Sequence, residues 1–309
     1  MNTMYKLSSL ALALSLALAG NIAHAELLTQ DFTVRDGKGN LIAAHATGLD
    51  WNQLGSGVAV GVGPYSTLLQ VGAEYDFLYQ ANLVNISGAV GPGDQGATYN
   101  RLDASPNGAP NLNKSFEFTL VSRQREVVLQ SLGVGASSYA MSGLVDGPGN
   151  KVAIFYDEAM NADTTKGTGF DDGIMIALLS IVSDGTGSDF SGKTASAGQG
   201  SARIHARIVA GAGDFIDPAY LIGMDDLMLG LSFEGNLAYP AGAASALAFH
   251  ASGTDPRFPT YHVTDNDIVV KVDGNNDFTR VPEPGSMLLM TIGMLGMAGV
   301  ARRRKQTKA

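Results

Sequence analysis

The chain has 309 residues and contains no cysteine. Disulfide bonds, thiol nucleophiles and cysteine-bound metals are therefore excluded, so burial of apolar side chains must stabilise the fold. Histidine is also scarce, with five residues, and neither the His-Glu-x-x-His pattern of zinc proteases nor the Gly-x-Ser-x-Gly pattern of serine hydrolases occurs. The sequence offers no catalytic signature of these kinds, and we predict that the protein is not an enzyme.

Positive charge is the next shortage. The terminal segments 1–25 and 281–309 hold six of the 20 basic residues but only one of the 29 acidic residues, which leaves a net charge of −14 on residues 26–280. Nucleic acid is therefore a poor partner for this part of the chain. An acidic surface can attract divalent cations or cationic polymers, although solubility is the commoner reason for such a composition.

The acidic body is followed by a segment of different composition. Val281, Pro282, Glu283 and Pro284 lead into the 17 uncharged residues 285–301, which end at four cations. As a helix these residues would extend roughly 25 Å, at the short end of the range that crosses a bilayer. By the positive-inside rule, the cations stay in the cytoplasm and the preceding residues face away from it. The four cations are Arg302, Arg303, Arg304 and Lys305.

This order of a Pro-Glu-Pro motif, an apolar helix and terminal arginines resembles the PEP-CTERM sorting signal of Gram-negative bacteria that make exopolysaccharide. The resemblance implies transient insertion in the inner membrane and cleavage near Pro282, Glu283 and Pro284 by an exosortase, a membrane transpeptidase-like enzyme. The body would then be released into the extracellular matrix or attached to the cell surface. A plain membrane anchor is the alternative interpretation of the same segment.

The N-terminus also predicts export. Lys6 precedes the apolar run 7–19, and Ala23 and Ala25 form the small-x-small pattern that signal peptidase recognises, so we expect cleavage before Glu26. The chain is therefore divided into a signal peptide at 1–25, an exported domain at 26–280 and a sorting signal at 281–309.

The exported domain alternates short apolar stretches with turns rich in the chain's 39 glycines, and it lacks long stretches with a helical period. This spacing predicts an all-β fold, mainly an antiparallel β-sandwich with long glycine-rich loops. One short helix is expected at 217–223, where Asp217, Pro218 and Gly223 supply its cap, first turn and end. The expected strands are 28–34, 41–46, 57–62, 75–86, 115–122, 126–132, 151–156, 174–183, 202–209, 227–233, 246–250 and 267–272.

Two of the expected strands also predict which faces they bury. The segment 173–182 is apolar throughout, which is typical of a strand covered on both sides. In contrast, 202–208 alternates apolar and polar residues, so Arg203, His205 and Arg207 should lie together on the outer face.

One segment matches a nucleotide-binding pattern. Residues 187–194 satisfy Gly-x-x-x-x-Gly-Lys-[Ser/Thr], the loop that binds phosphates when it opens a helix. The following residues, 195–200, are poor helix formers, and nucleoside triphosphates are scarce outside the cell. We therefore predict a hairpin loop rather than a nucleotide site.

Calcium is the one cofactor that the sequence leaves open. Asp273, Asn275 and Asp277 occupy positions one, three and five of a loop like that of an EF-hand, but the sixth position is not glycine and Pro284 stands where the bidentate glutamate should be. A true EF-hand is therefore excluded. Other hard ligands are offered at a turn by Asp171 and Asp172, where aspartate is also favoured because it binds local backbone amides. Plain turns are the favoured interpretation, and a structural Ca²⁺ is the alternative.

The body itself resembles flocculation-associated PEP-CTERM proteins at Trp51 and in the stretches 55–60, 79–84, 167–173 and 271–274. That family is tied to the gathering of cells within exopolysaccharide. The resemblance implies a matrix or cell-surface protein that promotes exopolysaccharide association, flocculation or biofilm formation by non-catalytic contacts.

Two other functions remain open, a glycan-active hydrolase or lyase in the same matrix and a calcium-dependent adhesin that self-associates. Tyr75, Tyr79 and Gln80 are candidates for sugar contacts if they face outward, although ordinary sheet surface is the commoner interpretation. The expected partners are signal peptidase, an exosortase and a cell-surface glycan.

Overall fold

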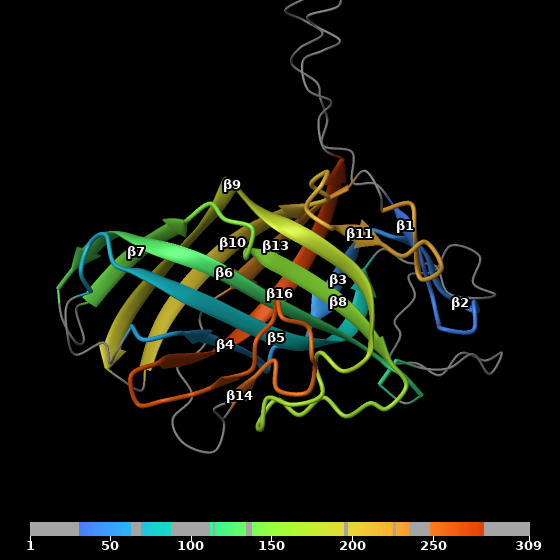
Figure 1. Cartoon of the computed structure of the whole chain (residues 1–309), viewed down its shortest axis with the longest axis horizontal. Coiled ribbons are helices and arrows are strands. Elements are labelled where there is room, and N and C mark those ends of the chain that lie inside the picture. Colours follow the sequence, from blue (N-terminus) through green and yellow to red (C-terminus); the bar gives the residue numbers. More distant parts are fainter. Residues whose placement is uncertain are drawn as a thin grey trace, which may run out of the picture. The chain divides into compact units, whose positions relative to one another are not determined.

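The computed structural model describes residues 31–62, 69–87, 112–113, 115–133, 138–194, 197–224, 227–234 and 248–280. Apart from Arg280, these residues belong to one compact unit, Thr29–Thr279, and they form strands and turns (Figure 1). The all-β, mainly antiparallel fold predicted from the sequence is confirmed. The expected terminal helices lie outside the described residues. Within the described ranges, no helix is long and apolar enough to span a bilayer.

The strands form three sheets. The main sheet contains β3 (Gly48–Trp51), β4 (Gly55–Ala59), β5 (Glu74–Ser87), β6 (Glu117–Leu132), β7 (Ser138–Leu144), β8 (Lys151–Asp157), β9 (Ile174–Thr194), β10 (Ala197–Arg207), β11 (Phe215–Ile216), β13 (Leu227–Glu234) and β16 (Ile268–Arg280). The second sheet contains β1 (Phe32–Arg35), β2 (Leu41–Ala46) and β12 (Leu221–Ile222). The third pairs β14 (Ala248–Phe249) with β15 (Tyr261–His262).

The main sheet closes on itself. From β5 the hydrogen-bonded pairings lead through β6, β9, β10, β13 and β16 and return to β5, with β7 and β8 sharing the place between β6 and β9. The short strands β3 and β4 share the place between β16 and β5. The sandwich expected from the sequence is thereby refined, because one closed sheet rather than two separate sheets surrounds the core. The circuit has eight strand positions, a size at which side chains can fill the interior.

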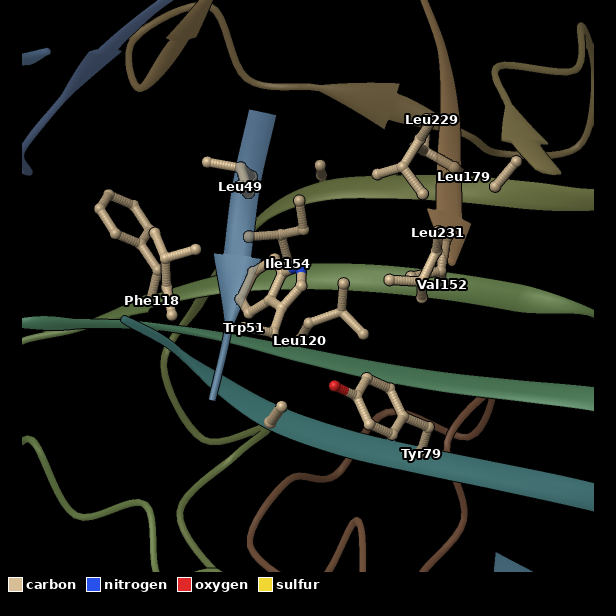
Figure 2. Packing of buried hydrophobic residues seen from close by; sticks show 14 of the residues in the cluster. Leu49, Trp51, Tyr79, Phe118, Leu120, Val152, Ile154, Leu179, Leu229 and Leu231 are labelled. Atoms are coloured by element: carbon tan, nitrogen blue, oxygen red, sulfur yellow. The ribbon is translucent and has the colours of Figure 1, made fainter. Parts of the chain in front are cut away.

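Aromatic and aliphatic side chains fill this interior. Trp51, Leu120 and Ile154 lie together in Figure 2, and none of them is more than 2% exposed. The indole Nε1 of Trp51 donates a hydrogen bond to the side-chain oxygen of Asn276, so its polar atom has a partner inside the sheet. On β10, Ile204 and other alternate residues also point into this cluster, as the period of two in a strand requires.

Two chain segments cover part of the outer face of the sheet. One is the connection between β8 and β9, and the other contains β14 and β15. Phe170 and Phe258 bury Val121 and Leu178 of the sheet in a second hydrophobic cluster. A third cluster is formed by Phe249, from β14, with Val58 of β4 and Leu78 of β5. The segment 173–182 was predicted to be covered on both sides, and this holds for its central part. Ile176 and Leu179 face the interior and Leu178 faces the outer cluster, whereas Ile174 near its start is 55% exposed.

The two covering segments touch at a glycine. Gly167 has a φ of +76°, and a Cβ at this position would lie 1.6 Å from the backbone oxygen of Ala248. The backbone oxygen of Lys166 also accepts a hydrogen bond from the amide of Ala248 at 3.2 Å. Only glycine fits here, since a side chain would separate the two segments.

One expectation is wrong and another is refined by the structure. The helix expected at 217–223 was wrong, because Leu221 pairs with Val34 in the second sheet and the chain before it forms turns around Asp217. The polar stretch 187–194 lies in β9 and continues through a short connection into β10, with Thr194 opposite Ala197. This confirms the hairpin and shows that it consists largely of paired strands.

Candidate functional site

The outer face of β10 carries a row of basic side chains, which we call the arginine stripe and define as Arg203, His205 and Arg207. The predicted orientation is confirmed, because Arg203 and Arg207 are exposed, whereas Ile204 and Ala206 between them are buried in the interior. The two arginine Cα atoms are about 13 Å apart, at the usual rise of a strand. β10 is hydrogen-bonded to β9 on one side and to β13 on the other, so the backbone of the stripe is held in place.

The neighbouring strands place uncharged residues beside the stripe. Arg203 is in register with Gly187 and Ser232, and Arg207 is in register with Ser180. Residues directly opposite one another share a face of the sheet. Within the described part of the chain, neither arginine forms an ion pair with an acidic residue.

A second polar cluster lies inside the closed sheet, around Glu126 of β6. The carboxyl oxygen Oε2 accepts hydrogen bonds from the Tyr75 hydroxyl at 2.6 Å and from Ser188 Oγ at 2.6 Å, while Gln124 Nε2 donates to Oε1. The Tyr75 hydroxyl is also hydrogen-bonded to Ser142 Oγ at 2.8 Å. Burial raises the pKa of Glu126, although its three hydrogen bonds act in the opposite direction. This arrangement can hold a proton in the core, but Glu126 is only 2% exposed and is enclosed by strands.

We expect Glu126→Gln to remove a pH dependence of stability. Because the pKa of Glu126 is raised in the folded state, the folded protein binds more protons than the unfolded chain once the pH exceeds about 4.3, and stability then falls with rising pH. Gln124 can turn its amide to accept from the new amide group, since its Oε1 has no partner among the described groups. The free energy of unfolding, measured with urea, should therefore favour the variant increasingly from acidic to alkaline pH. A constant difference would contradict this, and the exposed Asp265→Asn is the control.

The covering segment around β14 contains a buried histidine, His250, whose backbone has a φ of 51°. Its ring packs edge to face against Phe258, with centroids 5.5 Å apart. The side chain of Gln80, from β5, holds the backbone on both sides of Phe249. It donates a hydrogen bond to Ala248 O at 3.0 Å and accepts one from His250 N at 3.2 Å. Within the described structure, neither ring nitrogen has a hydrogen bond of normal geometry. Burial lowers the pKa of His250 to about 4, the nearby backbone of Tyr79 opposes this, and the charge of Arg123 lowers it further.

The two candidate calcium regions differ in local structure. Asp171 is 6% exposed, and its Oδ1 accepts from the amide of Ser252 at 3.1 Å, whereas Asp172 is exposed and accepts from Asn161 Nδ2 at 3.0 Å. Burial raises the pKa of Asp171, and the charge of Asp172 contributes to this.

The second region is not a loop. Asp273, Asn275 and Asp277 all lie in β16, where Asn275 pairs with Asp50 and Asp277 pairs with Gly48. Burial raises the pKa of Asp50, and the charge of Asp273 adds to the effect. Among the described residues, no group of three or more histidine, aspartate or glutamate side chains is arranged to hold a metal ion.

The side chains considered for sugar contacts point away from the surface. Tyr75 and Tyr79 face the interior and are 8% and 0% exposed, and Gln80 is buried beneath the segment around β14. The outward orientation on which this hypothesis depended was therefore wrong. Phe215 of β11 is an aromatic side chain on the surface, with an exposed fraction of 37%.

β16 ends at Arg280, and the predicted sorting motif follows directly in the sequence. The family model for the PEP-CTERM protein-sorting motif matches residues 280–305. The chain carries a PEP-CTERM sorting signal. The match spans Val281, Pro282, Glu283 and Pro284 together with Arg302, Arg303, Arg304 and Lys305. These residues lie outside the described structure, as do Ala23 and Ala25, whose part in signal cleavage stays a prediction.

The PEP-CTERM motif implies recognition by an exosortase and membrane-anchored sorting to the cell surface or beyond. None of the curated proteins and none of the solved structures gives a match to the chain. The resemblance of the body to flocculation-associated PEP-CTERM proteins therefore stays an expectation from the sequence.

Proposed function

We propose that the mature protein is an extracellular matrix or cell-surface protein that holds exopolysaccharide and cells together by non-catalytic contacts. The observation that carries this proposal is the PEP-CTERM motif at 280–305, which begins where the last strand of the closed sheet ends. Such a motif delivers its cargo to the surface, and the cargo here is an all-β body whose interior is occupied by its own side chains.

The surroundings of the acidic groups favour contact over catalysis. A glycosidase needs two carboxyl groups that face each other across an open groove, with one of them protonated. Burial raises the pKa of Glu117, but this residue is 4% exposed and its Oε1 accepts from the amide of Ala162 at 3.0 Å. Glu126 is likewise enclosed by its hydrogen-bonding partners. Calcium-dependent adhesion stays a prediction from the sequence.

Gene deletion and complementation test the proposal. We expect deletion to reduce cell aggregation and the amount of exopolysaccharide retained on cells, and the wild-type gene to restore both. A variant with Pro282, Glu283 and Pro284 replaced by alanine should remain in the membrane fraction with its C-terminus attached, because the exosortase no longer recognises it. Normal retention of exopolysaccharide in the deletion strain would overturn the proposed role. Normal processing of the alanine variant would instead overturn the sorting mechanism.

A further inference from the structure

Three large aromatic side chains of the main sheet do not lie on its surface. Tyr75, Tyr79 and Trp51 all point into the closed sheet, and neutral sugars are usually held by exposed aromatic faces together with hydrogen bonds. Charge and hydrogen bonding are the other means by which a protein surface binds a polysaccharide.

The arginine stripe supplies such charge on a body that is otherwise acidic. Arginine presents a planar fork of donors that matches a carboxylate or sulfate group. Arg203 and Arg207 on β10 are exposed residues, and they are in register with the uncharged residues Gly187, Ser180 and Ser232. Arg203 and Arg207 are therefore available to an external anion.

Two described carboxylates lie near the stripe, and each has its own partners. Asp214 accepts hydrogen bonds from Ser180, which is in register with Arg207, and from Lys151. The other is Asp189 of β9. It pairs with Ser201, two positions along β10 from Arg203, and accepts a hydrogen bond from Ser201 Oγ. This carboxylate thus has its own partner on the same strand pair and forms no ion pair with Arg203 among the described contacts.

We propose that Arg203 and Arg207 bind the anionic groups of an acidic polysaccharide, with the polymer lying along β10. The inference rests on the proposed contact with exopolysaccharide and adds that this polymer is negatively charged. Two arginines whose Cα atoms are about 13 Å apart on one strand can engage separate anionic groups of a linear chain. A small anion would reach only one of them, so the geometry favours a polymer with repeated negative charge.

The test uses mature protein recovered from the producing strain after expression of the full chain. Polygalacturonate is the anionic probe and dextran is the neutral probe, each measured at low and at high salt. Arg203→Gln with Arg207→Gln should weaken polygalacturonate binding about tenfold, the loss expected for two exposed charge contacts. Binding by the wild-type protein should also fall at high salt, and this dependence should be weaker in the variant.

The matched control removes the same amount of charge elsewhere. Lys38 and Lys166 are 68% and 71% exposed and lie beside Glu158 and Asp163, so replacing both lysines with glutamine changes the net charge equally without touching β10. The control should bind polygalacturonate like the wild type. Thermal unfolding of both double variants checks that each remains folded.

Four results would overturn the inference, and the first three concern polymer binding. These are unchanged polygalacturonate binding in the arginine variant, an equal loss in the lysine control, and equal binding of dextran and polygalacturonate. In the third case the proposed contact with exopolysaccharide would stand, but the polymer would not need to be anionic. Loss of self-association in the arginine variant, with polymer binding intact, would assign the stripe to a protein contact and would also contradict the inference. Failure of the proposed function is seen separately, as normal matrix retention in the deletion strain.

Discussion

Replacing Lys151 with methionine is expected to lower the free energy of unfolding by about 3–5 kcal/mol, the usual cost of removing one partner of a buried ion pair. The Nζ atom donates to Asp214 Oδ1 at 2.5 Å, to Ser180 Oγ at 2.8 Å and to the backbone oxygen of Ala212 at 3.1 Å. The side chains of Lys151 and Asp214 are 4% and 0% exposed. Without the lysine, a buried carboxylate would keep only its hydrogen bonds from Ser180 and Val209.

The lowered pKa of Asp214 also indicates that Lys151 stabilises the buried carboxylate. Burial alone would raise this pKa, but the hydrogen bonds from Lys151, Ser180 and Val209 and the charge of Lys151 outweigh burial and lower it. The contribution of Asp214 to stability is therefore present above the unfolded pKa of about 3.9 and is lost as the pH falls through the lower folded value. Urea unfolding at neutral pH measures the full effect of the ion pair.

Two further variants show whether the charge is responsible. Lys38→Met breaks a pair with Glu158 whose N–O distance is 3.7 Å and whose side chains are 68% and 57% exposed, so it should cost less than about 1 kcal/mol. Combining Lys151→Met with Asp214→Leu removes both buried charges and should recover part of the lost stability. If Lys151→Met unfolds at the same urea concentration as Lys38→Met, the buried pair does not stabilise the fold.

Acidification is expected to destabilise the protein through His250. Burial lowers its pKa from 6.5 to about 4, so the unfolded chain binds a proton between these values while the folded protein does not. Stability from this group is complete above about 6.5 and falls as the pH decreases, by about 3 kcal/mol on reaching the folded pKa. The outer segment around β14 should detach first, because the His250 ring packs there against the rings of Phe249 and Phe258.

His250→Phe keeps an aromatic ring at this position but cannot take up the proton. The free energy of unfolding of the variant minus that of the wild type should therefore become more positive as the pH falls from neutral to about 4. Contributions from the other titrating groups are common to both proteins and cancel in this difference. The exposed His262→Phe, in the neighbouring strand β15, is the control and should follow the wild type. Parallel pH profiles for the wild type and His250→Phe would contradict the prediction.

The sequence predicted strands well where apolar residues dominate. The range 41–46 coincides with β2, and 151–156 differs from β8 by one residue. The prediction from the sequence divided β6 into two strands at Arg123, Gln124 and Arg125, because three successive polar residues do not reveal a buried face. The sheet explains them, since Arg123 and Arg125 pair with acidic side chains of β5 on the outside while Gln124 faces the interior.

Pairing also produced strands where the sequence indicates turns. Residues 184–194 are rich in glycine, serine and aspartate, yet they extend β9 because β7 pairs on one side and β10 on the other. β7 itself, with the sequence Ser-Tyr-Ala-Met-Ser-Gly-Leu, has too little apolar character to be predicted. Such segments depend on neighbours distant in the sequence, which local patterns do not encode.

The functional residues were predictable to different degrees. The sorting motif is a local signal, and residues 281–284 could be found without any structure. The arginine stripe follows from simple alternation along one strand, so its orientation was also predictable. Glu126 and His250 were not, because their burial depends on strand register and on a covering segment. No sequence signal separates Glu126 from the solvated carboxyl groups.

The closure of the main sheet limits how this protein can adhere. A strand at a free sheet edge offers a row of unpaired backbone groups that can capture a strand from another molecule, and fibrils grow by such additions. In the main sheet, the strands of the circuit are paired on both sides. Cohesion through the main sheet must therefore rely on side chains, which salt or pH can reverse, rather than on the nearly irreversible growth of shared backbone ladders.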